Sequence, residues 1–143
     1  SINYFNKFIN LINNQKSQIY LYGTWPVPMM EGKKFPGQDP IQRALRPLES
    51  KNIKIVPVGT AFRLFQQKHP NISLFTSDNK HPSPVGVYLA ACVFLKTFTG
   101  ITPIGLYRRF DRKDEYGKKI FLGMIETSDA KKCQKIVDAM NIN

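Results

Sequence analysis

The two residues best suited to chemistry in this sequence are Asp78 and His81, which lie three positions apart in a polar stretch. An aspartate at this spacing can turn back and accept a hydrogen bond from one ring nitrogen of the histidine. That bond fixes the imidazole tautomer and leaves the second nitrogen free to act as a base. The pair therefore suits nucleophilic or general-base catalysis. The spacing alone equally fits a turn or capping role for Asp78, which is a common use of aspartate in loops.

The segment that follows this pair is the most apolar part of the chain and predicts a helix over residues 85–99. Ser83 and Pro84 are typical of a helix start, and Gly100 is typical of a helix end. Apolar side chains occupy almost every position of the segment. We therefore expect this helix to be buried on most sides, packed against a sheet and covered by a further element.

The rest of the chain alternates between helical and extended patterns. Periodicity and turn residues predict helices over 1–14, 40–48, 60–68 and 130–140, and strands over 18–22, 52–58, 106–110 and 119–125. Pro47 must kink the second helix, residues 127–129 suit the cap of the last one, and 26–38 should form an irregular loop. The short strand-to-helix links favour α/β layers with a largely parallel sheet.

Composition and charge limit the classes of function. The 143 residues are 42% hydrophobic, which suits one globular domain with a sizeable core, and no apolar run is long enough for a transmembrane segment. Lys and Arg outnumber Asp and Glu by 21 to 10, so the net charge is +11. This excess suits an anionic partner or a plain solvated surface. The aromatic residues do not alternate with the basic ones, so we do not expect nucleic acid as a partner.

The two cysteines give no indication of a metal site. Cys92 lies in the apolar helix and is typical of a small core residue, and Cys133 lies 41 positions further along. That separation matches neither a zinc-ligand spacing nor a disulfide framework. We expect neither a metal nor another cofactor.

Residues 74–100 resemble the last conserved block of the SGNH (GDSL-type) hydrolases, which carry Asp-x-x-His, then Pro, then a helix rich in Gly, Tyr, Leu and Ala that ends in Thr-Gly. Two further segments look like the strand ends of one branch of that family, Leu21-Tyr-Gly-Thr-Trp-Pro26 and Val56-Pro-Val-Gly-Thr-Ala-Phe62. Residues 128–140 look like its last helix. The resemblance covers most of the chain and is most specific at residues 74–100.

This resemblance implies a flavodoxin-like three-layer α/β/α fold, with residues 1–143 as the C-terminal part of a single domain. It also implies a serine esterase in which His81 deprotonates a serine and Asp78 orients His81. Trp25, in a strand-end loop, suits the wall of an acyl or sugar pocket, and we place Thr24 beside it as a second substrate-binding residue. A core or rim aromatic is the other interpretation of Trp25.

The sequence departs from the family pattern at the nucleophile. The family's Gly-Asp-Ser or Gly-Asn-Ser motif and its glycine and asparagine oxyanion donors do not occur here. Ser77 is too close in sequence to face His81, and Ser83 suits a helix cap better. Since the first residue is Ser and not Met, we expect an N-terminal segment or a second chain to supply these groups for a small ester substrate.

Two alternatives to the esterase remain open at this point. One is a catalytically inactive SGNH-like module that binds an anionic glycan, lipid or nucleic acid. The other is a structural α/β fragment whose basic surface docks onto an acidic other half. The sequence does not distinguish sugar O-acetyl esters, lipids and small acyl esters as substrates, and it does not indicate a compartment.

Overall fold

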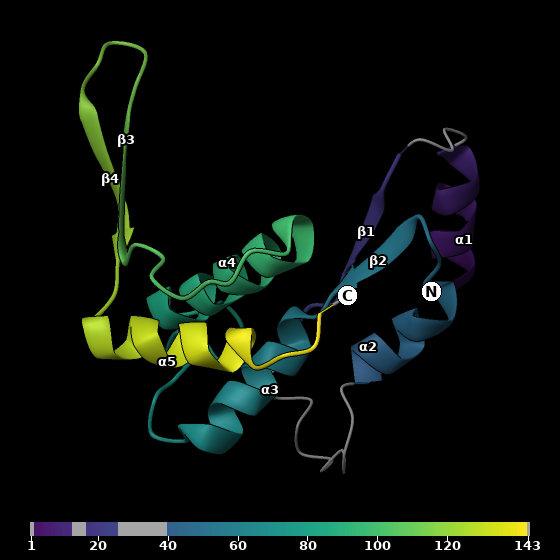
Figure 1. The fold of residues 1–143 in the computed structure, drawn as a ribbon, viewed down its shortest axis with the longest axis horizontal. Coiled ribbons are helices and arrows are strands. Elements are labelled where there is room, and N and C mark those ends of the chain that lie inside the picture. Colours follow the sequence, from purple (N-terminus) through teal and green to yellow (C-terminus); the bar gives the residue numbers. More distant parts are fainter. Residues whose placement is uncertain (1, 13–16, 26–39, 143) are drawn as a thin grey trace.

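The computed structural model describes residues 2–12, 17–25 and 40–142 of a mixed α/β chain (Figure 1). The predicted loop over residues 26–38 lies outside the described residues. In chain order the elements are α1 Ile2–Leu11, β1 Ile19–Tyr22, α2 Pro40–Leu45, the 3₁₀ turn η2 Arg46–Leu48, β2 Ile53–Val56, α3 Val58–Lys68, α4 Pro84–Thr99, β3 Arg109–Lys113, β4 Lys119–Met124 and α5 Thr127–Asp138. Within the described residues, no helix is both long enough and apolar enough to cross a membrane.

Strands β1 and β2 form a short parallel sheet with helices on both of its faces. Their register runs from Ile19 opposite Ile53 to Tyr22 opposite Val56. Side chains that point to one face form a small core with α2, made of Leu21, Ile55 and Leu45. On the other face, the ring of Tyr20 lies 4.5 Å from that of Phe98 of α4. The predicted α/β class is confirmed, whereas two parallel strands do not establish a flavodoxin-like three-layer fold.

The main core lies where α3, α4 and α5 meet. Its fully buried side chains come from each of these helices and include Phe62, Leu89 and Val137. Both cysteines are also buried there, which confirms the predicted core position of Cys92. Burial raises the pKa of the Cys92 thiol to about 12, so this group is an inert packing residue near neutral pH.

Several predicted boundaries shift in the structure. The kink at Pro47 is confirmed, since α2 ends at Leu45 and a 3₁₀ turn follows it. The prediction for the last helix was wrong at its start, because Glu126 is the N-cap residue and no side chain caps the helix. The strand predicted over 106–110 begins only at Arg109.

Helix α4 begins and ends as predicted. The hydroxyl of Ser83 accepts a hydrogen bond from the backbone N–H of Gly86 at 3.2 Å, and Gly100 ends the helix with a φ of 71°. The expectation that α4 is covered on most sides is wrong along one stripe. Val87 and Phe98 keep 55% and 50% of their surface exposed, although Val87 lines the groove beside the β3–β4 hairpin and the ring of Phe98 contacts Tyr20.

Strands β3 and β4 form an antiparallel hairpin that projects from the helical body (Figure 1). Its base is fixed by Arg108, whose Nη1 donates to the carbonyl oxygen of Ile125 at 2.9 Å. A groove of about 670 Å³ lies between the hairpin and the first turns of α4, lined by apolar residues such as Val87 and Phe121. The largely parallel sheet expected from the sequence is therefore only half correct, since the second pair of strands is antiparallel.

Candidate active site

The loop that carries Asp78 and His81 is closed at its neck by backbone hydrogen bonds. Phe75 and Pro82 form an antiparallel bridge, and the N–H of Thr76 donates to the carbonyl of His81 at 2.9 Å. The turn needs one left-handed residue, which Asn79 provides with a φ of 54°. Asparagine tolerates this region better than most residues. The neck therefore holds the two ends of the loop together directly before α4 begins.

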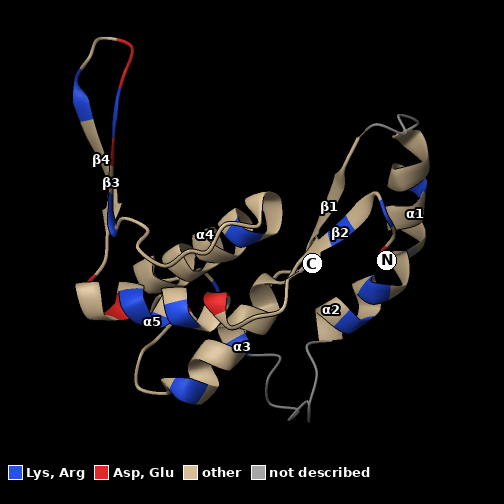
Figure 2. Cartoon of the chain, in the orientation of Figure 1, with Lys and Arg blue, Asp and Glu red and all other residues tan. Residues whose placement is uncertain are grey.

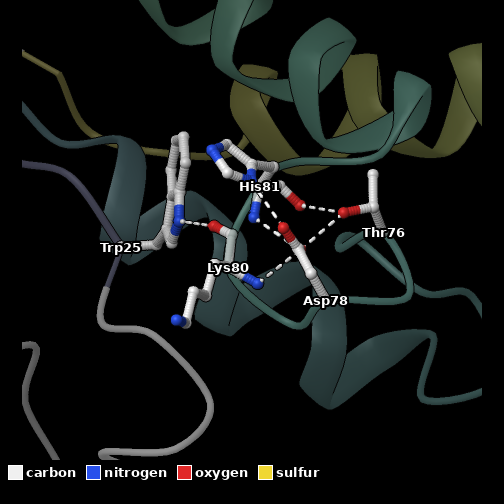
Figure 3. Close-up of polar contacts among 5 residues, drawn as sticks. All are labelled: Trp25, Thr76, Asp78, Lys80 and His81. Atoms are coloured by element: carbon white, nitrogen blue, oxygen red, sulfur yellow. Dashed lines mark hydrogen bonds and ion pairs between the residues drawn. The ribbon is translucent and has the colours of Figure 1, made fainter.

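Within this loop, the structure brings Asp78 and His81 into direct contact (Figure 3). Oδ2 of Asp78 lies 2.5 Å from Nδ1 of His81. Since an ionised carboxylate only accepts hydrogen bonds, a neutral imidazole in this contact must carry its proton on Nδ1. The spacing that suggested an orienting carboxylate thus corresponds to an observed pair.

The second oxygen of Asp78 is held just as firmly. Oδ1 accepts hydrogen bonds from the Thr76 hydroxyl at 2.7 Å and from the backbone N–H groups of Lys80 and His81 at 2.9 and 3.0 Å. The bond from His81, followed by those from Thr76 and the backbone, holds the pKa of the Asp78 carboxyl well below its usual range. The carboxylate therefore stays ionised and cannot rotate away without losing several bonds.

The free nitrogen of His81 faces outward. The histidine side chain is 79% exposed, and Nε2 lies on the far side of the ring from Asp78 (Figure 3). Among the described residues, none bonds to Nε2. An imidazole with this tautomer and an open Nε2 can accept a proton from a hydroxyl that approaches from outside the described residues.

Trp25 packs beneath the loop rather than standing apart from it. Its ring stacks on Phe62 with the centroids 4.6 Å apart, and its Nε1 donates to the carbonyl oxygen of Lys80 at 3.3 Å (Figure 3). It therefore links the end of β1 to the residue directly before His81. This half-buried position agrees with a rim aromatic, and a contact with substrate stays a prediction.

Thr24 lies between β1 and Trp25 and is half-buried. Its side chain shares a hydrogen bond with the hydroxyl of Tyr22. Burial raises the pKa of that tyrosine, so its hydroxyl stays neutral. The structure does not show Thr24 in contact with Asp78 or His81, and its role in substrate binding stays a prediction.

Gly86 allows α4 to approach the segment in front of the loop. A Cβ atom at this position would lie 2.4 Å from the carbonyl oxygen of Leu74, much closer than any side chain tolerates. The N–H of Ser83 donates to the same carbonyl at 2.8 Å. The missing side chain therefore sets how closely the loop sits on the helix.

Thr76 contacts both members of the candidate site, and the sequence analysis missed it. Its hydroxyl completes the bonding of Asp78, and a second contact of 3.3 Å reaches the carbonyl of His81. The sequence showed only that threonine and aspartate, two residue types that form local hydrogen bonds in loops, lie two positions apart. The role of Thr76 could not be predicted from this spacing, because it depends on the fold, in which residues 76 and 81 lie opposite each other at the base of the loop.

The described serines do not complete a triad. Ser77 is exposed, and the Ser83 hydroxyl donates to the carbonyl of Ser73 at 2.9 Å while it caps α4. In the described part of the chain, no serine side chain bonds to His81. The same residues hold no cluster of three or more His, Cys, Asp or Glu side chains placed to bind a metal ion.

Comparisons with protein-family models, with curated proteins and with solved structures found no match for this chain. The relationship to SGNH hydrolases therefore stays a prediction that rests on the quoted motifs. The geometry of residues 76–81 is an independent observation.

Proposed function

We propose that this chain supplies the acid–base part of a serine esterase of the SGNH type, on a flavodoxin-like α/β/α domain. His81 is the general base and Asp78 is the residue that positions it. The nucleophilic serine and the oxyanion donors belong to a segment outside these residues. The observation that carries this proposal is the 2.5 Å contact between Asp78 Oδ2 and His81 Nδ1 beside an open Nε2.

The proposed reaction follows from this arrangement. Nε2 of His81 takes the proton of the serine hydroxyl while the serine oxygen bonds to the ester carbonyl carbon. The imidazolium that forms is stabilised by the Asp78 carboxylate and returns its proton to the departing alcohol, which leaves an acyl-enzyme. Water then loses a proton to the same Nε2 and attacks the acyl carbonyl. The acid is released, and the serine regains its proton from His81.

The bonding of Asp78 supports this role over a pure turn role. A turn needs only the bonds that Oδ1 accepts from the backbone at residues 80 and 81. The contact from Oδ2 to the imidazole adds nothing to the turn, but it fixes the tautomer and orientation that a base requires. Trp25 and Thr76 then hold this loop from two sides.

A matched pair of histidine variants tests the proposal. The chain is combined with the polypeptide encoded directly upstream of residue 1 and assayed on p-nitrophenyl acetate. His81→Ala should lower kcat by about 10³-fold or more, as expected for a triad member. His69→Ala is the control, since His69 lies at the C-terminal end of α3 and contacts Phe65 instead. Equal activity of the two variants would disprove the role of His81.

The alternative is an inactive module that binds an anionic partner, and the +11 charge is its motivation. Figure 2 shows Lys and Arg on both sheets and on helices at opposite ends of the molecule, not gathered on one element. Among the described residues, this distribution does not favour one element as the binding site for a polyanion. Binding to heparin that weakens steeply as salt rises would nevertheless favour this alternative, provided that the chain shows no esterase activity.

A further inference from the structure

The groove between the β3–β4 hairpin and the first turns of α4 has the size of a ligand-binding site. Its volume of about 670 Å³ falls within the usual range for small-molecule sites, about 300–1,000 Å³. One wall includes Pro82 and Val87, and the other includes Phe121 and Leu122 of β4. Val87, Phe121 and Leu122 are exposed although they are apolar. Since Pro82 follows His81 directly in the chain, the groove lies next to the loop of the candidate site.

An irregularity in the hairpin brings consecutive residues to this groove. In a regular strand, successive side chains point to opposite sides of the sheet. The register of the hairpin shifts between Phe110, which pairs with Gly123, and Asp111, which pairs with Phe121, so Leu122 is the extra residue of a bulge. A bulge bends its strand and changes the direction of its side chains. Residues 121–125 can therefore line the groove together, as the structure shows.

The polar groups of the lining indicate which kind of molecule fits. The Tyr88 hydroxyl already has partners, because it donates to the carbonyl oxygen of Leu106 and accepts from the side chain of Gln134. A peptide would bring an N–H and a C=O group with nearly every residue, and each of these needs a partner when it is buried. The side chains of this lining are almost all apolar. The groove therefore suits a hydrocarbon chain better than a peptide.

The charged residue of the lining is Arg108, which is half-buried at the base of the hairpin. Its Nη1 donates to the carbonyl oxygen of Ile125. In the part of the chain that the structure describes, the other two guanidinium nitrogens of Arg108 have no hydrogen-bond partner. A guanidinium carries five N–H donors and binds carboxylates through two parallel hydrogen bonds. Arg108 can therefore bind an anionic group at one end of a hydrocarbon chain.

We propose that this groove binds a fatty acid, with the hydrocarbon chain between α4 and the hairpin and the carboxylate on Arg108. Burial of the chain against Val87 and Leu122 supplies the affinity, and the guanidinium selects an acid over an uncharged chain. The binding does not require His81 and goes beyond the proposed function. A fatty acid is also the acid that a long-chain ester would release, and this link alone rests on the proposed function.

The test measures the binding of decanoate to the 143-residue chain by isothermal titration calorimetry. A Cβ atom at Gly123 would meet no other atom within 4 Å, so a side chain fits there without a clash. Gly123→Phe should weaken binding by about tenfold or more, because the ring takes the space of the ligand. Leu122→Asn is a second groove variant, used as well if Gly123→Phe fails to fold by circular dichroism. Ile101→Asn is the matched control, since Ile101 is 58% exposed against 59% for Leu122 and lies after the end of α4.

Two comparisons of ligands complete the test. Affinity should rise by about twofold or more for each CH₂ group added from hexanoate to decanoate, because a longer chain buries more apolar surface. 1-Decanol has the same chain without the carboxylate and should bind about tenfold more weakly or less, since it forms no charge-assisted bond with Arg108. Equal binding of 1-decanol and decanoate would overturn the fatty acid as the occupant.

The other outcomes separate this proposal from its alternatives and from the proposed function. The proposal is overturned if decanoate does not bind, if Ile101→Asn weakens binding as much as Leu122→Asn, or if the groove instead holds a second copy, seen as a dimer that Gly123→Phe dissociates. Decanoate binding that Gly123→Phe removes, without hydrolysis of p-nitrophenyl acetate, would support the groove and count against the esterase. Hydrolysis that requires His81, without decanoate binding, would do the reverse.

Discussion

The loop over residues 76–81 and one side of α4, marked by Val87 and Phe98, are both exposed to solvent, but they differ in the groups that exposure leaves without partners. In the loop, the carboxylate of Asp78 has partners for both oxygens, and the backbone neck is closed. On the exposed side of α4, Val87 and Phe98 have about half of their surface in water, and their side chains have no polar atoms that could bond to it. Exposure in the loop therefore leaves every oxygen of the carboxylate paired, whereas exposure on the helix leaves apolar surface in contact with water.

The largest expected effect is on catalytic activity and comes from Asp78 in the loop. Asp78→Asn keeps the size of the side chain but removes the charge, and its amide can pair with the wrong tautomer of His81. We expect kcat on p-nitrophenyl acetate to fall by about 10⁴-fold in the assembled enzyme. In ¹⁵N NMR of the chain alone, the fraction of His81 protonated on Nδ1 should fall as well. An unchanged tautomer in the variant would contradict the orienting role of Asp78.

The next largest expected effect is on stability and comes from the buried side of α4. Leu89 is fully buried in the main core, so Leu89→Ala should lower the free energy of unfolding by about 2–5 kcal/mol. Urea denaturation followed by circular dichroism measures this change. A loss below about 1 kcal/mol would mean that the side of α4 assigned to the core is not packed.

The junction between the loop and the helix should have a smaller effect. Ser83→Ala removes the hydroxyl that accepts from Gly86 N–H and should lower the free energy of unfolding by about 1 kcal/mol. The same denaturation experiment measures it. Ser83→Thr is the control, because threonine keeps the capping oxygen and should restore most of the loss.

Substitution on the exposed side of α4 should change the stability of the chain least. Val87→Ala should change the free energy of unfolding by no more than about 0.5 kcal/mol, because the side chain is already half in water. A loss as large as that of Leu89→Ala would show that this face is covered even in the isolated chain. The contrast between the two faces of the helix would then be wrong.

The contribution of Asp78 to stability should be lost only in strong acid. Because the pKa of Asp78 is lowered in the folded chain, its bonds contribute stability above the pKa of an unfolded aspartate, about 3.9. That contribution is lost as pH falls through the lower folded value. The difference in stability between the wild-type chain and Asp78→Asn should therefore be constant above pH ~5 and shrink in stronger acid. Thermal melts of both proteins from pH 7 to 2 measure this difference.

The elements that the sequence predicted best have strong local signals. Ser83, Pro84 and Gly100 placed α4 to within one residue, and Pro47 marked the kink after α2. The first strand of the hairpin was misplaced, because β3 carries one aromatic residue, Phe110, among charged residues, and such an exposed strand has little hydrophobic periodicity. The order of elements was thus easier to predict than their ends.

The candidate site was predictable as a pair but not as a network. The spacing of Asp78 and His81 indicated their contact, whereas the bonds of Thr76 and Trp25 depend on chain segments that meet only in the fold. The burial of α4 was overestimated for a physical reason. An apolar composition shows that a helix needs cover, but it does not show which segment supplies it.

The absence of a side chain at Gly86 has a consequence for how this loop can be altered. A methyl group there would clash with the carbonyl oxygen of Leu74, so the backbone in front of residues 76–81 would have to shift. Substitution of Gly86 would therefore change the position of the His81 imidazole relative to α4 without altering either member of the acid–base pair. Protein engineers who wish to change the reach of this base, and keep its chemistry, would begin with that residue.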